Sequence, residues 1–282
     1  MGDLDAFLPR SSLSQWQSRG KKTPLPLDLL SGSTAALQFQ ARKLRIYSTT
    51  LKSANMNVDM KNGRLSAPFQ ASFSGGGSLR GIFSAVAAGG AADTTLNYTT
   101  SDVDMLNLSR DRAQDTLISG RGSSSASLSA RQACWDDWKN TLNGEMSFRI
   151  VSGRIFSASS SPREGDDTPF KSMSMSATAR NGIISSNDFL LKGSMSSIKG
   201  SGEISLATLA IDARAVMTLV GIPELPFTIS GTLGEPKISY KVLGAVTGTV
   251  GNIGSTLFDI VGGILTAPIR LVTGNRFLGG KE

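Results

Sequence analysis

The residue types that could carry out chemistry are few in this chain. No histidine occurs among its 282 residues, and Cys134 is the single cysteine. Ser-His-Asp and Cys-His mechanisms both need an imidazole base, and zinc sites of the Cys/His type need several such ligands. The sequence therefore excludes these two mechanisms, Cys/His zinc sites and any disulfide within the chain.

Three short patterns resemble known sites, and none of them predicts one. Ser196 and Lys199 fit the pattern S-x-x-K, but that chemistry needs the lysine one helical turn from the serine, and both residues fall in an expected strand or turn. Asp102 and Asp104 lack the glycine-centred loop of a calcium site. The three glycines at 75–77 lack the spacing of a phosphate-binding loop. We therefore expect no catalytic residue, no metal and no cofactor, and we interpret the protein as non-enzymatic.

Strands with one apolar and one polar edge fill most of the chain. Between residues 142 and 240, Met146, Phe148 and Ile150 alternate with polar residues, and the run that contains Met173 and Met175 does the same. A two-residue period places alternate side chains on opposite faces of a sheet. Turn residues lie between the runs, at 152–153, 181–182 and 231–236. The pattern predicts a long antiparallel sheet with one apolar face.

Two further patterns predict local structure. A unit with an Asn-Gly pair occurs twice, at Asn62-Gly63 and Asn181-Gly182, and such pairs between alternating runs predict tight hairpins that stack side by side. Residues 132–142 carry Trp135, Trp138 and Leu142 at helical spacing, which predicts an amphipathic helix with both tryptophans in the core.

The charge of the chain does not indicate nucleic-acid binding. The formal net charge is +7, but lysine and arginine are scattered along the strands, and aromatic residues make up only 6% of the chain. Single-strand binding platforms combine basic and aromatic residues along one groove. We therefore expect no nucleic-acid partner.

Composition divides the chain into three parts. Residues 1–26 are polar and contain prolines, which predicts a linker or flexible arm, and residues 27–241 hold the strands. Residues 242–282 are rich in glycine and apolar residues, which predicts an amphipathic helical segment that plugs the end of the sheet or lies on a membrane. The residues expected to face a membrane are Phe258, Ile264, Leu265, Arg270 and Arg276.

The predicted apolar face must be covered by something. Acyl chains of lipids could cover it, and the same residues could instead form the dry core of a closed sandwich or barrel; alternation alone leaves both open. The residues of this face, and so the candidate lining of a groove, are Met146, Phe148, Ile150, Met173, Met175, Phe189, Leu191, Ile204, Ile211, Phe227 and Ile229.

Several segments resemble the C-terminal region of AsmA-family proteins. These are LPLDLL at 25–30, LNGEMSFRIVSGRI at 142–155, TPFKSMSMSATARNGII at 168–184 and GIPELPFTISGTLGEPK at 221–237. The resemblance favours the groove. It implies a mainly all-β fold: an elongated, curved antiparallel sheet that forms an open hydrophobic groove, with a few short helices and a C-terminal amphipathic helical segment. Residues 27–241 would be the AsmA-like β-groove domain.

The resemblance also implies a function. The protein would lie on the periplasmic side of the Gram-negative envelope, associated with the inner membrane, although the family's N-terminal anchor is absent from this chain and Met1 could begin a truncated part. It would bind or conduct phospholipid acyl chains between the inner and outer membranes. The alternative is a structural or interaction module that assists outer-membrane protein assembly or targeting without carrying lipid. The expected partners are phospholipid, a membrane surface contacted by the C-terminal segment, and envelope proteins, with the chain itself a monomer.

Overall fold

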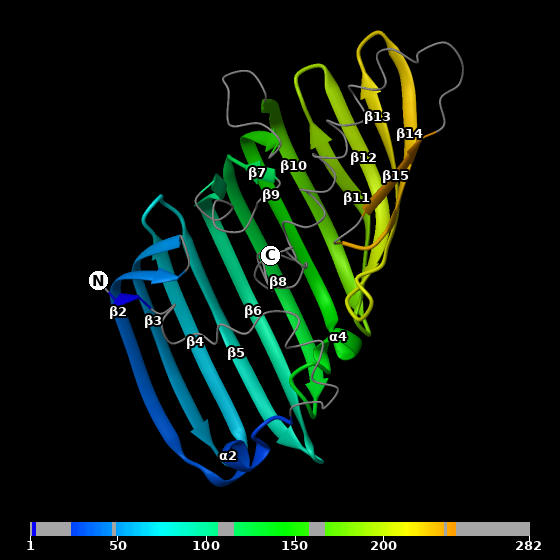
Figure 1. Ribbon diagram of the computed structural model, residues 1–282. Coiled ribbons are helices and arrows are strands. Elements are labelled where there is room, and N and C mark those ends of the chain that lie inside the picture. The colour runs from blue at the N-terminus through cyan, green and yellow to red at the C-terminus, as the bar shows by residue number, and fades with distance from the viewer. Residues whose placement is uncertain are drawn as a thin grey trace. The chain divides into compact units, whose positions relative to one another are not determined.

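Antiparallel strands dominate the computed structural model, which describes residues 2–3, 24–46, 49–106, 116–157, 167–233 and 236–240. They join into one sheet in the order β1-β2-β3-β4-β5-β6-β8-β9-β10-β11-β12-β13-β14-β15, with β7 beside β9 (Figure 1). Almost every strand therefore pairs with the next one along the chain. The predicted fold is confirmed for the described residues: the sheet is open and unclosed, only two short helices accompany it, and this is consistent with a curved sheet that forms a groove.

The chain divides into two compact units. Unit 1 comprises Met1–Val103, Gly122–Phe148 and Ala177–Ile184, and unit 2 comprises Asp104–Arg121, Arg149–Ser176 and Ser185–Glu282. The first elements are β1 (Gly2–Asp3), α2 (Leu27–Gly32), β2 (Ala35–Ile46), β3 (Thr49–Lys61), β4 (Arg64–Phe73), β5 (Ser78–Ala88), β6 (Ala91–Asp104), β7 (Thr116–Ile118) and β8 (Arg121–Gln132). The remaining ones are α4 (Trp138–Thr141), β9 (Asn143–Ser157), β10 (Asp167–Arg180), β11 (Ile183–Lys192), β12 (Ser196–Ser205), β13 (Ile211–Leu219), β14 (Ile222–Gly231) and β15 (Pro236–Tyr240).

The strand register assigns the two faces of the sheet in unit 1. Phe39 lies opposite Met56, Met56 lies opposite Phe69, and Phe83 lies opposite Leu96. Directly opposed residues of antiparallel strands share a face, and the next residues along each strand point the other way. We call the side with these five residues the apolar face of unit 1, and the other side its polar face. In β2 to β6 the apolar face comprises alternate residues of Ala35–Ala41, Ala54–Met60, Leu65–Ala71, Leu79–Ala87 and Ala92–Thr100.

Both predicted Asn-Gly hairpins are confirmed. Asn62 and Gly63 have φ of 51° and 73°, and Asn181 and Gly182 have φ of 50° and 77°. Positive φ at both central residues is the conformation of a type I′ turn, whose twist matches that of the flanking strands. These turns join β3 to β4 and β10 to β11.

Single residues in the left-handed conformation reset the side-chain alternation inside long strands. Lys43 has a φ of 53°, and Leu44 after it is buried beside Ala41 on the apolar face. Ser152 has a φ of 51° in the same way, within the continuous strand β9. The expected turn at 152–153 is therefore wrong. The residue pair marks an irregularity within a strand, and the strand goes on to the buried Ile155.

The predicted helix over residues 132–142 is also wrong for most of its length. Only Trp138–Thr141 is helical. The carboxylate of Asp137 accepts hydrogen bonds from the backbone N–H groups of Ala133 (2.9 Å) and Cys134 (2.8 Å), which holds the preceding residues in a turn. Trp135 lies on this turn with half of its surface exposed (50%), so it is not the core anchor that its spacing predicted.

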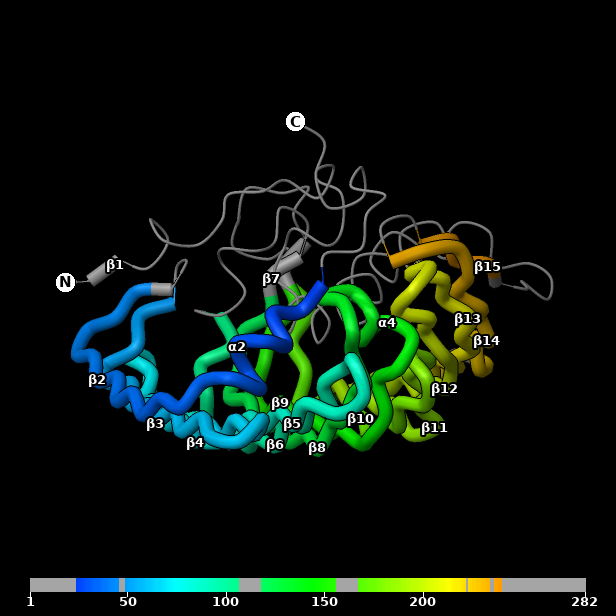
Figure 2. Tube along the Cα trace, turned by 90° about the horizontal axis from the view of Figure 1, so that it is seen from below, coloured from blue at the N-terminus to red at the C-terminus, as the bar shows by residue number. Residues whose placement is uncertain are grey.

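Helix α2 packs on the apolar face of unit 1. Its buried Leu30 contacts Ala85 and Ala92, and Leu27 and Met60 pack around them. The helix lies at one end of β3, β4 and β5 (Figures 1 and 2). It therefore covers the apolar face at the end where β3 meets β4.

Several predictions concern residues outside the described part of the chain. The linker prediction falls largely on them, and the C-terminal segment with Phe258, Ile264, Leu265, Arg270 and Arg276 falls on them entirely. Among the described residues, no helix has the length and apolar character that a membrane span requires.

Candidate functional site

Large apolar side chains are left uncovered on the apolar face of unit 1. Four of them are exposed: Leu37, Phe39, Met56 and Phe83. The Leu37 side chain retains 64% of its accessible surface. The alternate residues that form this face in β2 to β6 include no charged side chain. Soluble domains rarely expose a contiguous apolar surface unless it binds a partner or a ligand. The apolar face of unit 1 is therefore a candidate binding site.

Gly81 leaves room for an aromatic side chain on this face. Gly81 lies opposite Phe69 on one side and Tyr98 on the other. A Cβ atom on Gly81 would lie 2.5 Å from the Cζ atom of Phe69 and 2.9 Å from the Cβ atom of Tyr98. The Phe69 ring therefore occupies the space that a side chain at position 81 would take.

One end of the apolar face is closed by the segment that carries α2. Pro24 forms a β-bridge with Cys134, and the Leu25 N–H donates to the carbonyl oxygen of Ala133 at 2.9 Å. The segment then crosses to β3, β4 and β5, where Leu30 is buried. Residues 24–32 thus run from the end of β8 to the ends of β3, β4 and β5.

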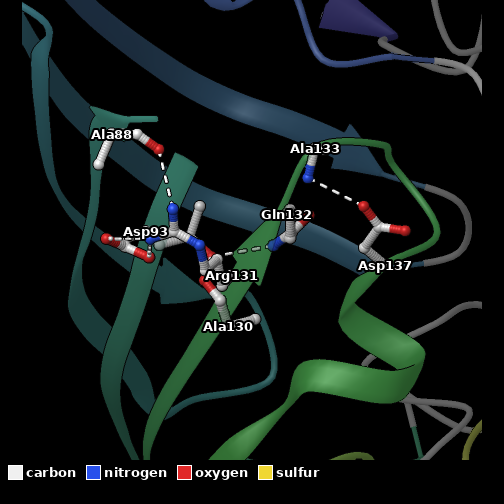
Figure 3. A network of polar contacts seen from close by, with 8 residues as sticks. Ala88, Asp93, Ala130, Arg131, Gln132, Ala133 and Asp137 are labelled. Carbon is white, nitrogen blue, oxygen red and sulfur yellow. Dashed lines mark hydrogen bonds and ion pairs between the residues drawn. The ribbon is translucent and has the colours of Figure 1, made fainter. Parts of the chain in front are cut away.

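A polar network stabilises this closed end (Figure 3). Arg131 on β8 forms an ion pair with Asp93 on β6 at 3.0 Å and also donates to the carbonyl oxygen of Ala88 at the β5–β6 turn at 3.0 Å. At the next residue along β8, the side-chain amide of Gln132 donates to the hydroxyl of Thr94 at 2.9 Å. The Thr94 hydroxyl in turn donates to the carbonyl oxygen of Ala130. These bonds tie β5, β6 and β8 together beneath the α2 segment.

The opposite end of the face holds a separate apolar cluster. Leu44, Leu51 and Ala54 are buried there, and Ala71 and Phe73 pack against them. These residues lie near the end of β2, the start of β3 and the β4–β5 turn, far along the strands from α2. Both ends of the apolar face are therefore well packed, while the exposed residues lie between them.

The predicted lining residues lie in both units and differ in burial. Met146 and Phe148 belong to unit 1, and the others belong to unit 2. Five are half-buried: Met146, Phe148, Met175, Phe189 and Ile204. Six are buried: Ile150, Met173, Leu191, Ile211, Phe227 and Ile229.

The register of β12 to β15 brings several of the unit 2 residues onto one side. Ile204 lies opposite Ile211, and Phe227 and Ile229 lie opposite Ala215 and Ala213. Gly202 faces Ala213 so closely that a Cβ atom on the glycine would lie 2.4 Å from the Cβ atom of Ala213. Unit 2 therefore also has an apolar face, but most of its large side chains are covered.

The exposed residues of unit 1 were not among the predicted lining. Leu37 and Phe39 alternate with Gln38 and Gln40, which is typical of a strand, but this alternation does not show that the two side chains are uncovered. The sequence does contain a signal for this site: one face of β2 to β6 has no charged residue. The signal can be recognised only after the hairpin register has assigned each residue to a face.

Among the described residues, the titratable groups with shifted pKa values form no acid–base pair. Burial raises the pKa of Tyr98, although a hydrogen bond with Ser124 works against this shift. Slight burial opposes the charged form of Asp188, but hydrogen bonds from Ser176 and Ser186 lower the pKa of this carboxyl overall. No other titratable side chain contributes to the pKa shift of Tyr98 or of Asp188.

The S-x-x-K pattern lies on a strand. Ser196 and Lys199 both belong to β12, where Ser196 lies opposite Leu219 and Lys199 lies opposite Val216. Residues three apart on a strand point to opposite faces, so the lysine amine is directed away from the serine hydroxyl. The described residues also include no group of three or more His, Cys, Asp or Glu side chains that could hold a metal ion.

Comparisons with known proteins give no match: no family model, no curated protein and no solved structure is similar to this chain. The function is therefore inferred from the geometry of the apolar face.

Proposed function

We propose that the protein binds the acyl chains of phospholipids along the apolar face of unit 1. The observation that carries the proposal is the exposure of Leu37, Phe39, Met56 and Phe83 on a face of β2 to β6 that has no charged residue. Water contact with such a surface is unfavourable, and each methylene group that becomes buried on it contributes about 0.8 kcal/mol. An acyl chain supplies many methylene groups in a row and needs no polar partner.

Features of the face favour a flexible apolar ligand. Methionine side chains adapt to ligands of varied shape, and Met56 and Met60 both lie on this face. Gly81 has no side chain, so the Phe69 ring lies directly over its backbone. This leaves room for an acyl chain along the apolar face. By the resemblance to AsmA-family proteins, the lipid would be carried in the Gram-negative envelope.

Two adjacent residues on β5 give a matched test. Phe83 lies on the apolar face and Ile82 on the polar face, and both side chains are 37% exposed. We expect Phe83→Asp to weaken binding of a fluorescent acyl-chain probe by about 30-fold or more, because bound lipid would bury the new carboxylate. Ile82→Asp should leave binding unchanged. Both variants should keep the urea midpoint of the parent, because neither side chain is buried.

Native mass spectrometry of the detergent-free protein gives the second measurement. Co-purified phospholipid is expected with the parent and with Ile82→Asp, and much less with Phe83→Asp. A parent protein that is repeatedly free of lipid and does not bind the probe would refute the proposal. That result would instead favour an interaction module that does not carry lipid.

A further inference from the structure

The charged residues of β2 to β5 are distributed unequally along the strands. Four exposed cations lie toward the end of β2, the start of β3 and the β4–β5 turn: Arg42 and Lys43 in β2, Lys52 in β3 and Arg80 in β5. Residues 35–58 and 65–92 contain no aspartate or glutamate. We call this part of unit 1 the basic end.

The other end of the same strands carries charges of both signs. Asp59, Lys61 and Arg64 lie around the β3–β4 turn. Asp93 near the β5–β6 turn is paired with Arg131. Within β2 to β5 the charge asymmetry therefore follows the strand direction, and the basic end lies opposite the end that α2 covers. The nearest acidic residues at the basic end are Asp102 and Asp104, at the end of the neighbouring strand β6.

The basic end adjoins apolar side chains. Arg42 lies opposite Ser53, next to Lys52. Leu44 and Leu51, which lie opposite each other, form the apolar cluster of this end with Phe73. A surface that offers cations and, directly beside them, the start of an apolar face is complementary to the headgroup and the acyl region of an anionic bilayer.

We propose that the basic end of unit 1 docks on the surface of a bilayer that contains anionic phospholipid. The inference deepens the proposed function and rests on it, because docking at this end would bring the apolar face of unit 1 to the surface of a lipid source. The cations contact phosphate-bearing headgroups, and the apolar cluster of Leu44, Leu51 and Phe73 lies between them and the uncovered residues of the face.

A nucleic acid is the other polyanion that cations attract. Binding of single strands usually adds aromatic side chains on which bases stack. The aromatic residues of β2 to β5 (Phe39, Phe69, Phe73 and Phe83) lie on the apolar side of the sheet, away from Arg42 and Arg80. Charge complementarity together with the adjoining apolar cluster therefore favours the bilayer.

Co-sedimentation of the full chain with vesicles tests the proposal. We expect binding to vesicles of phosphatidylcholine with phosphatidylglycerol, weaker binding at high salt, and little binding to phosphatidylcholine alone. Each cation near an anionic surface contributes about a fivefold gain in affinity, so Arg42→Gln/Lys52→Gln/Arg80→Gln should lower the affinity by about 100-fold.

The control removes the same charge elsewhere. Lys61→Gln/Arg64→Gln/Lys199→Gln also changes the net charge from +7 to +4, because three cations are lost in each variant. It should bind the vesicles almost as well as the parent. Equal affinities of the two variants, or a parent that prefers an oligonucleotide and ignores the vesicles, would overturn the proposal.

A label reports the orientation directly. Ser74 lies in the β4–β5 turn at the basic end, and Lys61 lies at the other end of the same strands; both are exposed. In a Cys134→Ser background, a fluorophore on Ser74→Cys should be quenched by brominated lipid much more than one on Lys61→Cys. Equal quenching would refute end-on docking. The acyl-probe assay with Phe83→Asp is independent of both tests, so a failure of docking and a failure of acyl binding can be told apart.

Discussion

At the scale of single residues, Tyr98 reports on the apolar face of unit 1. It is one of three tyrosines in the chain, and burial raises its pKa above the usual 10.0. The native state therefore keeps the phenol proton at pH values where the unfolded chain has lost it. Tyr98 thus lowers the free energy of unfolding as the pH rises above 10.0, and it has no effect well below that pH. A titration of phenolate absorbance should show one late step that is absent in Tyr98→Phe.

The hydrogen bond to Ser124 gives this prediction a control. It lowers the pKa of Tyr98 and so opposes the effect of burial. Ser124→Ala should therefore shift the late step to still higher pH, and Tyr98→Phe should lose less stability than the parent above pH 10.0. A late step that persists in Tyr98→Phe would show that another tyrosine is the buried one.

At the scale of the elements, the two Asn-Gly turns have similar backbones and different surroundings. A Cβ atom on Gly63 would meet only the Cβ atom of Ala87, at 3.7 Å. One on Gly182 would lie 1.8 Å from the carbonyl oxygen of Lys139, and the Gly182 N–H donates to the carbonyl oxygen of Leu142 at 2.9 Å. The second turn is thus packed against α4, while the first is in open surroundings.

Alanine at each position separates backbone strain from packing. Gly63→Ala should cost about 1 kcal/mol, because only the left-handed conformation is disfavoured. Gly182→Ala should cost about 3 kcal/mol, because the turn must also move away from α4. Urea unfolding measures both values. Equal losses would mean that the contact with α4 does not contribute to stability.

The elements also show which structural features can be read from sequence. Alternation and Asn-Gly pairs predicted the strands and both hairpins, because each depends on a few neighbouring residues. The helix over 132–142 failed because the Asp137 carboxylate satisfies two backbone N–H groups and stabilises a turn in place of helix. The position of Lys43 in the left-handed conformation could not be predicted either, since it depends on which face Leu44 must reach.

At the scale of the whole molecule, alternation gives the same signal for a covered face and for an uncovered one. Met173 and Phe83 both lie in alternating strands, yet Met173 is 1% exposed and Phe83 is 37% exposed. The difference depends on which segments of the chain pack above each side chain, and the sequence pattern does not contain that information. The predicted lining lies mostly in unit 2, whereas the exposed apolar residues on β2, β3 and β5 belong to unit 1.

An open sheet with an exposed apolar face should have a stability that depends on its ligand. A ligand that binds the folded state alone adds about 2.7 kcal/mol when its concentration is 100 times the dissociation constant. We expect a short-chain phospholipid, below its micelle concentration, to raise the urea midpoint of the parent and of Ile82→Asp, and to leave that of Phe83→Asp almost unchanged. The exposures of Ile82 and Phe83 are equal, so a general solvent effect of the lipid would act on both variants alike. An equal shift in the two variants would therefore place the bound lipid somewhere other than the apolar face of unit 1.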